Sequence, residues 1–222
     1  MSFSILVMSC DKYKQYTEKL FYHCIEKYWS NHPKVYYCLE TKDNPYYETI
    51  HSNYPVDKWS LRLVEALKQI KSKIVLVCPD DTFFRKKVND KVIDKLSTYI
   101  DNKLIAINLE PAFDGFKVNE ILSIRDSSKK WLTSMMPQLW NKDKLIEIIG
   151  DKELSPRQVE HIGKGTPYIY GIINDTSYID FGKVKGIYPY AITEGKWAKE
   201  IVSFCKQEQV EIDFSGLGFY DK

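Results

Sequence analysis

IVLVCPDDTFF, at residues 74–84, is the segment that decides the fold, because an apolar run typical of a buried strand ends there in two adjacent carboxylates. Ligands of open α/β sheets bind at the edge where such strands end. The carboxylates of Asp80 and Asp81 repel each other and lose hydration when partly buried, so they need compensation. A divalent cation that also binds substrate phosphates provides it. The segment therefore predicts a cation and diphosphate site, with a plain Pro-Asp-Asp turn as the alternative.

Strand and helix patterns alternate on both sides of this segment. Continuous apolar runs predict buried strands, and apolar residues at helical spacing predict helices between them. The predicted strands are residues 3–8, 35–39 and 104–109, and the predicted helices are residues 16–29, 59–70 and 88–99. This order is typical of an α/β fold, in which a mainly parallel sheet is covered by helices on both faces.

The second half of the chain is less regular. A helix is expected over Met135–Ile149, with Pro137 near its start. Residues 155–158, Ser-Pro-Arg-Gln, have the pattern of a capping box that begins a short helix carrying Glu160. The remaining expected elements are strands at 168–173 and 186–192 and a closing helix at 197–206. No repeat, low-complexity tract or linker is visible, so we expect one domain over residues 1–222.

Length and composition limit the class of protein. A chain of 222 residues can bury a sizeable core as one domain, and its 32 basic and 30 acidic residues create no net field that favours nucleic acid. Scattered cysteines and histidines indicate reduced core cysteines and argue against a zinc site. Neither a signal peptide nor an apolar segment of about 20 residues is visible. We expect a cytoplasmic protein, with peripheral contact at the inner face of the membrane left open.

Two polar segments are expected near the carboxylate pair. Ser9, Asp11 and Tyr13 lie in the loop after the first strand, at the same edge of the sheet as Asp80. Asp11 is suited to accept a hydrogen bond from a base or ribose and Tyr13 to stack on a base, with helix capping by Asp11 as the alternative. Arg62 precedes the acidic strand, and its guanidinium suits phosphates or a pairing with the acidic loop, unless it is a surface arginine.

Glu160 and Lys196 are the candidates in the second half. A transferase that inverts a sugar carbon needs a base to take the proton of the acceptor hydroxyl, and glutamate is a usual choice. In the segment Gly-Lys-Trp at residues 195–197, a flexible residue precedes a cation suited to close over a leaving diphosphate. A solvated helix glutamate and a turn before the last helix are the respective alternatives.

Two hydrolase patterns fail at the acidic segment. Phosphatases with a strand-terminal aspartate nucleophile need Asp-x-Asp-x-Thr, and Cys78 stands at the nucleophile position counted back from Thr82. A Pro-Asp…Asp/Glu-x-Lys nuclease fails because no second strand places the Asp/Glu-x-Lys nearby. Both classes are therefore set aside.

Taken in order, several segments resemble a bacterial family of small GT-A-fold glycosyltransferases that build capsular and lipopolysaccharide sugars. They occur in a consistent order over most of the chain. The matching segments are LVMSCDKY (6–13), WSLRL (59–63), DDTF (80–83), QLWNK (138–142), SPRQVE (155–160) and GKW (195–197).

The resemblance implies a nucleotide-sugar donor, a glycan or lipid-linked acceptor and an inverting single displacement. It implies a donor half at about residues 1–110 and an acceptor half at about 111–222. By analogy, Asp81 binds a Mn²⁺ or Mg²⁺ ion and Glu160 is the base. Thr82 is a departure, because it stands where the second aspartate of an Asp-x-Asp metal motif would fall. The implied donor-binding residues are Ser9, Asp11, Tyr13, Ser60, Arg62, Asp80 and Lys196.

Two other functions stay open. A nucleotidyltransferase that activates a sugar phosphate on a similar sheet usually carries a Gly-rich loop with Arg and Lys after the first strand, and residues 9–13 contain no glycine. A non-catalytic sugar- or protein-binding domain would tolerate the loss of both Asp81 and Glu160.

Overall fold

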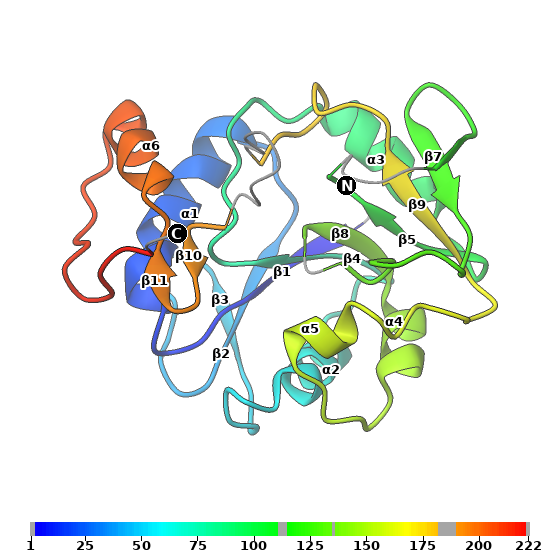
Figure 1. The fold of residues 1–222 in the computed structure, drawn as a ribbon, viewed down its shortest axis with the longest axis horizontal. Helices are drawn as coiled ribbons and strands as arrows, with labels where there is room; N and C mark the ends of the chain where they lie inside the picture. The colour runs from blue at the N-terminus through cyan, green and yellow to red at the C-terminus, as the bar shows by residue number, and fades with distance from the viewer. Residues whose placement is uncertain (1–2, 111–114, 135, 182–189, 221–222) are drawn as a thin grey trace.

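A nine-stranded sheet forms the centre of the computed structural model, which describes residues 3–110, 115–134, 136–181 and 190–220 (Figure 1). Its strands are β1 (Phe3–Met8), β2 (Val35–Leu39), β3 (Glu48–His51), β4 (Ile74–Pro79), β5 (Leu104–Asn108), β6 (Phe116–Lys117), β7 (Leu122–Arg125), β8 (Gln138–Asn141) and β9 (Ile169–Ile173). Their order across the sheet is β3-β2-β1-β4-β8-β5-β9-β7-β6. Strands β1 to β5 and β9 share one direction, whereas β8 runs antiparallel to β4 and β5, and β7 antiparallel to β9.

Helices cover both faces of this sheet. They are α1 (Lys14–Tyr28), α2 (Trp59–Gln69), α3 (Asp90–Tyr99), α4 (Lys142–Ile149), α5 (Pro156–Val159) and α6 (Glu200–Glu208). Because side chains alternate along a strand, Ile5 and Val7 of β1 join a core with α1, α3 and α6, while Leu6 and Met8 join a second core with α2 and α4. The predicted fold class, an α/β arrangement with a mainly parallel sheet between helices, is confirmed.

The helix expected over Met135–Ile149 is wrong in its first half. Residues 138–141 form β8, which lies between β4 and β5, and α4 begins only at Lys142. Leu139 packs into the core with α1, and Trp140 into the core with α2, as the alternation of a strand requires. A short apolar run does not distinguish a buried strand from a helix by periodicity, so the local pattern left the two indistinguishable. Met135 itself lies outside the described residues.

Several other elements differ from the sequence-based expectation. Strands β3, β6 and β7 have no counterpart among the predicted elements. The closing helix expected from Trp197 begins at Glu200, because Lys196–Trp197 form the short strand β11, which pairs with β10 (Ile192–Thr193). Of the strand expected at 186–192, only residues 190–192 lie within the described part of the chain, and only Ile192 among them is in a strand.

Two local predictions are confirmed. The capping box of α5 is present: the Ser155 hydroxyl accepts the Gln158 N–H at 3.4 Å, and the Ser155 N–H donates to Gln158 Oε1 at 2.8 Å. The five cysteines are buried free thiols.

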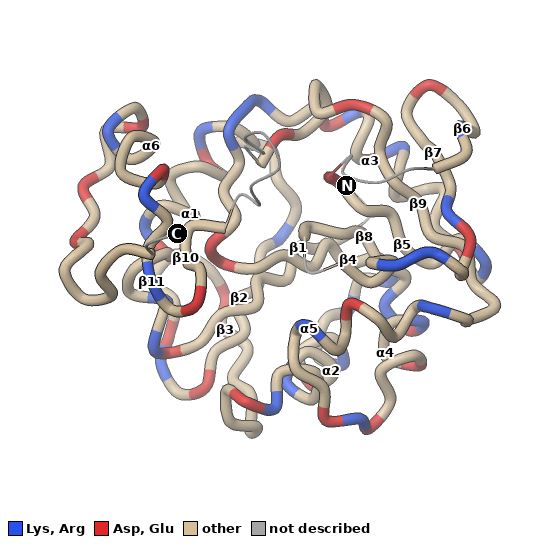
Figure 2. The backbone as a smooth tube through the Cα atoms, in the orientation of Figure 1, with Lys and Arg blue, Asp and Glu red and all other residues tan. Residues whose placement is uncertain are grey.

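Basic and acidic residues are interspersed along the described chain (Figure 2). Within that part, no helix has the length and apolar character to cross a membrane.

Candidate functional site

Asp80 is fixed at the end of β4 by its neighbour strand. Because β1 and β4 pair in parallel with Met8 opposite Pro79, the next residues, Ser9 and Asp80, lie side by side. Ser9 Oγ donates to Asp80 Oδ2 at 2.5 Å, and Thr17 Oγ1, from the start of α1, donates to the same oxygen at 2.6 Å. The structure thus brings together Ser9 and Asp80, which the sequence places at one sheet edge.

Asp80 and Asp81 are a carboxylate pair whose pKa values are raised by burial and which has no ion-pair partner among the described residues. Burial raises the pKa of Asp80, although the Ser9 and Thr17 hydroxyls oppose this shift. For the adjacent carboxyl, burial and then the charge of Asp80 raise the pKa of Asp81 to about 8, against a weaker opposing contact from the Ile192 N–H. No lysine or arginine among the described residues forms an ion pair with either aspartate. A bound cation would therefore favour the ionised pair.

Asp81 also holds the hairpin that carries Lys196. Its backbone oxygen accepts the Ala191 N–H at 2.9 Å, and its Oδ2 accepts the Ile192 N–H at 3.2 Å. The hairpin of β10 and β11 turns at Gly195, whose φ of +78° suits glycine. Lys196 follows with an exposed side chain. The turn expected before the last helix is present in this hairpin, whereas a role of Lys196 at a leaving diphosphate stays a prediction.

Tyr13 lies against the same hairpin. A Cβ atom placed on Gly195 would come within 3.0 Å of the Tyr13 hydroxyl oxygen, so the two chain segments touch. Tyr13 therefore contacts the hairpin that carries Lys196, and a role of either residue in donor binding stays a prediction. The side chain of Tyr13 is half-buried.

Arg62 is a buried arginine and not a surface one. Only 1% of its surface is exposed, its Nη2 lies 2.7 Å from Glu40 Oε1, and the same nitrogen donates to the Ser9 backbone oxygen at 2.8 Å. The expected pairing of Arg62 with the loop of Asp80 and Asp81 is not formed among the described residues, because its acidic partner is Glu40, and a contact of Arg62 with phosphates stays a prediction. Its contact with Ser9 links the helix α2 to the loop that also holds Asp80.

Glu40 is the residue of this cluster that the sequence reasoning missed. It is the first residue after β2, so it lies at the same carboxyl edge of the sheet as Ser9 and Asp80. Its Oε2 accepts the Asp11 N–H at 2.6 Å, in addition to the ion pair with Arg62. The signal that could have found it is its position, an acidic residue directly after a buried strand that pairs with β1.

Asp11 fastens the loop after β2. Its carboxylate accepts the backbone N–H groups of residues 40–42 and the Thr41 hydroxyl, the last at 2.6 Å. Burial opposes the ionised form, but these hydrogen bonds outweigh it and hold the pKa of Asp11 below its ordinary value. The capping alternative is wrong, because the N-cap of α1 is Tyr13. A contact of Asp11 with a base or ribose stays a prediction.

Ser60 does not join this cluster. It is fully buried, its hydroxyl donates to the Lys152 backbone oxygen at 2.6 Å, and it accepts the Leu154 N–H at 2.8 Å. Ser60 thereby ties the start of α2 to the loop that precedes α5. Nothing in these contacts supports the donor-binding role implied by the resemblance, which stays a prediction.

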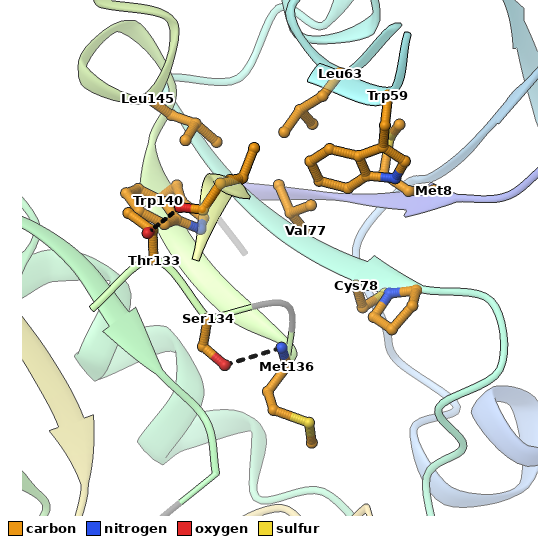
Figure 3. A pocket seen from close by; sticks show the side chains of 12 residues that line it. Met8, Trp59, Leu63, Val77, Cys78, Thr133, Ser134, Met136, Trp140 and Leu145 are labelled. Atoms are coloured by element: carbon orange, nitrogen blue, oxygen red, sulfur yellow. Dashed lines mark hydrogen bonds between the residues drawn. The ribbon is translucent and has the colours of Figure 1, made fainter. Parts of the chain in front are cut away.

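A small hollow, partly open to solvent, lies between the end of β4 and α5, and its lining stops short of Asp80, Asp81 and Glu160. Figure 3 shows side chains of α2, β1, β4 and β8 facing one another around it. Cys78 and Pro79, which precede the acidic pair, form one wall, and Val159, which precedes Glu160, forms another. Thr133 Oγ1 donates to the Val159 backbone oxygen, which closes this end of the hollow. Glu160, at the end of α5, is half-buried.

The side chains at the end of β4 fit a cation only if substrate supplies further ligands. Among the described residues, no group of three or more His, Cys, Asp and Glu side chains is placed to hold a metal ion. Thr82, at the position of a second motif aspartate, is fully buried. Asp80 and Asp81 are the two carboxylates that the end of β4 supplies for a cation. Mg²⁺ in particular is bound in this manner, through one or two carboxylates together with substrate phosphates and water.

Comparisons with known proteins give similarity of fold only. No protein-family model and no curated protein matches the chain. The structure is similar to a cytidylyltransferase from Leptospira borgpetersenii (12% identity, 73% of this chain and 69% of that chain, TM-score 0.44). It is also similar to 4-diphosphocytidyl-2C-methyl-D-erythritol synthase from Anaerococcus prevotii (10% identity, 82% and 91%, TM-score 0.44). A third similar structure is S. aureus TarS in complex with UDP-GlcNAc (13% identity, 88% and 62%, TM-score 0.47).

Proposed function

We propose that this chain is a glycosyltransferase that moves a sugar from a nucleotide-sugar donor to a hydroxyl of a glycan or lipid-linked acceptor in surface polysaccharide synthesis, with inversion. One observation carries the proposal. A buried strand ends in two adjacent aspartates at the edge where the loops after β1 and β2 converge, and burial, followed by the charge of Asp80, raises the pKa of Asp81 there. A divalent cation compensates the negative charge of the aspartates and can bind the phosphates of a diphosphate at the same time.

In this proposal the donor lies against the loop after β1. Asp81 would hold a Mn²⁺ or Mg²⁺ ion, with Asp80 beside the donor, and the ion would supply charge neutralisation for the departing nucleoside diphosphate. Tyr13 contributes an aromatic face from the loop after β1. Lys196 contributes a cation from the neighbouring hairpin. Arg62 acts as a positioning residue, because its guanidinium holds the Ser9 backbone and Glu40.

The acceptor approaches from the side of α5. Its hydroxyl oxygen forms the new bond to the anomeric carbon while the bond from that carbon to the diphosphate oxygen breaks. The hydroxyl proton passes to the Glu160 carboxylate, and the negative charge leaves with the diphosphate. Glu160 suits this role because it follows Val159, which lines the same hollow as Cys78 and Pro79, the residues before Asp80.

The division into a donor half, at about residues 1–110, and an acceptor half, at about 111–222, belongs to the same proposal. Both halves contribute to one site, since Asp81 bonds the backbone of residues 191–192. A cytoplasmic location with contact at the inner face of the membrane also belongs here, because a lipid-linked acceptor is presented at that surface.

The products of turnover test the proposal. The full chain with Mn²⁺ is incubated with UDP-, GDP-, CDP- and TDP-sugars, and separately with nucleoside triphosphates and sugar 1-phosphates. Glycosyl transfer, or slow hydrolysis of the donor, releases a nucleoside diphosphate from the first set. Pyrophosphate released from the second set alone would instead identify a nucleotidyltransferase. Turnover of neither set would favour the non-catalytic binding domain.

A further inference from the structure

Trp131 is an exposed tryptophan held in an unusual backbone conformation. Of the five tryptophans, Trp29, Trp140 and Trp197 are buried and Trp59 lines the hollow, whereas Trp131 is 37% exposed. Its φ is +59°, in the left-handed region that bulky residues avoid. Such strained residues persist where the surrounding structure enforces them, and they cluster at binding sites.

The loop that presents Trp131 is tied down by the chain around it. Arg125, at the end of β7, is only 7% exposed, and its guanidinium donates to the backbone oxygens of Lys130 at 2.9 Å and Trp131 at 3.3 Å. The Gly165 N–H donates to the Ser127 oxygen at 2.9 Å. These bonds fix the backbone on both sides of the indole. The exposed ring is therefore a positioned feature of the fold.

The indole packs against the residue that follows the proposed base. The ring centroids of Trp131 and His161 lie 4.9 Å apart at an interplanar angle of 46°. Next to them, a Cβ on Gly163 would meet Leu132 Cβ and Thr133 Cγ2 at 3.0 Å, so the two segments are in direct contact. Trp131 thus packs on the residue that directly follows Glu160, next to the segment of Thr133 and Val159 that lines the α5 end of the hollow.

We propose that Trp131, supported by His161, is an acceptor subsite on which a pyranose ring stacks. The apolar C–H face of a sugar matches an exposed indole, while the sugar hydroxyls stay in water or reach neighbouring polar groups. Stacking there would hold an acceptor hydroxyl beside Glu160, and positioning of this kind lowers the barrier to transfer. The assignment of the sugar as acceptor rests on the proposed function.

Binding of simple glycosides tests the subsite without turnover. Saturation-transfer NMR is recorded on the full chain with the methyl glycosides of glucose, galactose, rhamnose, N-acetylglucosamine and N-acetylgalactosamine. At least one glycoside is expected to bind the wild type. Trp131→Gly, which removes the indole and tolerates the positive φ, is expected to weaken that binding at least tenfold. Trp131→Phe is expected to retain part of it.

Phe116→Ala is the matched control, because Phe116 is a 69% exposed aromatic residue on β6. It should bind the same glycoside as the wild type does. The proposal is overturned if no glycoside of the panel binds, or if Trp131→Gly binds as well as the wild type. It is also overturned if Trp131→Gly instead loses only the binding of vesicles containing phosphatidylglycerol, which would make Trp131 a membrane contact.

A parallel titration with nucleoside diphosphates and Mn²⁺ separates this inference from the proposed function. If nucleoside diphosphate binds but no glycoside binds in a way that depends on Trp131, the subsite proposal is rejected and the glycosyltransferase proposal stands. If a glycoside binds in a way that depends on Trp131 but no nucleoside diphosphate binds, the transferase proposal is rejected and Trp131 is part of a sugar-binding surface.

Discussion

A buried carboxylate is tolerable at Asp80 because two hydroxyls bond the same oxygen. Ser9 comes from the loop after β1 and Thr17 from the first turns of α1, so the aspartate joins two elements. If one of the two hydroxyls is removed, the buried carboxylate keeps fewer hydrogen bonds. The protein then loses more stability than it loses with an average hydrogen bond.

Thr17→Val is therefore expected to destabilise the protein by about 1.5–3 kcal/mol, the usual contribution of a hydrogen bond to a charged group. Valine keeps the shape and the β-branching of threonine, so helix α1 itself is little affected. Urea unfolding measures the change. Thr98→Val, at an exposed position in α3 where the hydroxyl bonds its own helix, should be close to neutral.

The raised pKa of Asp81 predicts a pH-dependent weakness of the metal-free protein. The folded state keeps the Asp81 proton between about pH 4 and pH 8, where the unfolded state has lost it, so unfolding free energy falls as pH rises through this window. Asp81→Asn removes this dependence. At pH 8.5 the variant should exceed the wild type in thermal stability by on the order of 1 kcal/mol or more. At pH 4 the two should converge, and the exposed Asp57→Asn should follow the wild type throughout.

Glu160→Gln tests the base at the level of one atom. The amide keeps the size of the side chain and cannot accept the acceptor proton. Transfer is expected to fall by about 10²–10⁴-fold, while the affinity for nucleoside diphosphate stays unchanged. Glu153→Gln, an exposed glutamate in the loop before α5, serves as the control in the same assay. Wild-type transfer by Glu160→Gln would remove Glu160 from the base role.

At the residue scale, sequence reasoning found positions more reliably than contacts. The meeting of Ser9 with Asp80 follows from strand ends in a parallel sheet, which local patterns reveal. The pairing of Arg62 with Glu40 joins a helix to a loop 22 positions earlier in the chain, and no local pattern specifies it. For the same reason, the sequence did not indicate the hydrogen bonds of Ser60 to the loop at 152–154.

At the scale of elements, long periodic segments were predictable and short ones were not. β1 and β2 have the predicted bounds, and α1, α2 and α3 lie where the apolar spacing puts them. β8, by contrast, is four residues long, and its neighbours in the sheet come from segments far away in sequence. Its strand conformation depends on the space between β4 and β5, which tertiary packing alone creates.

The attachment of α6 to α1 is the element contact most open to a pH test. Glu208 is buried and accepts hydrogen bonds from Lys27 at 2.8 Å, Tyr28 at 2.6 Å and His23 at 3.1 Å. Burial alone would raise the pKa of Glu208, but these donors outweigh it and hold the pKa below the ordinary value. The resulting stability is present above the pKa of the unfolded state and is lost as pH falls through the lower, folded value.

Glu208→Gln should accordingly destabilise the protein by about 1.5–3 kcal/mol at pH 7, and by progressively less below about pH 4. Urea unfolding at a series of pH values measures this. Glu211→Gln changes an exposed glutamate just beyond α6 and should have little effect at any pH. An equal loss for Glu208→Gln at pH 3 and pH 7 would contradict the assigned role of the carboxylate.

At the scale of the whole molecule, distant parts of the chain meet at the sheet edge that carries Asp80 and Asp81. The loops after β1 and β2 reach it from the first half, and the hairpin of β10 and β11 reaches it from the end of the chain. The sequence indicated the α/β order and this edge. It could not indicate that Asp81 holds the hairpin, because that contact spans 111 positions.

The measurement that tests the central claim most directly is the melting temperature with UDP, GDP, CDP or TDP, each with and without Mn²⁺. One diphosphate with Mn²⁺, at about 100 times its Kd, should raise the wild-type melting temperature by roughly 5–10 °C. Asp81→Asn should lose most of this increase, and Asp57→Asn should keep it. No increase with any of the four diphosphates, or an undiminished increase in Asp81→Asn, would contradict a diphosphate site at the end of β4.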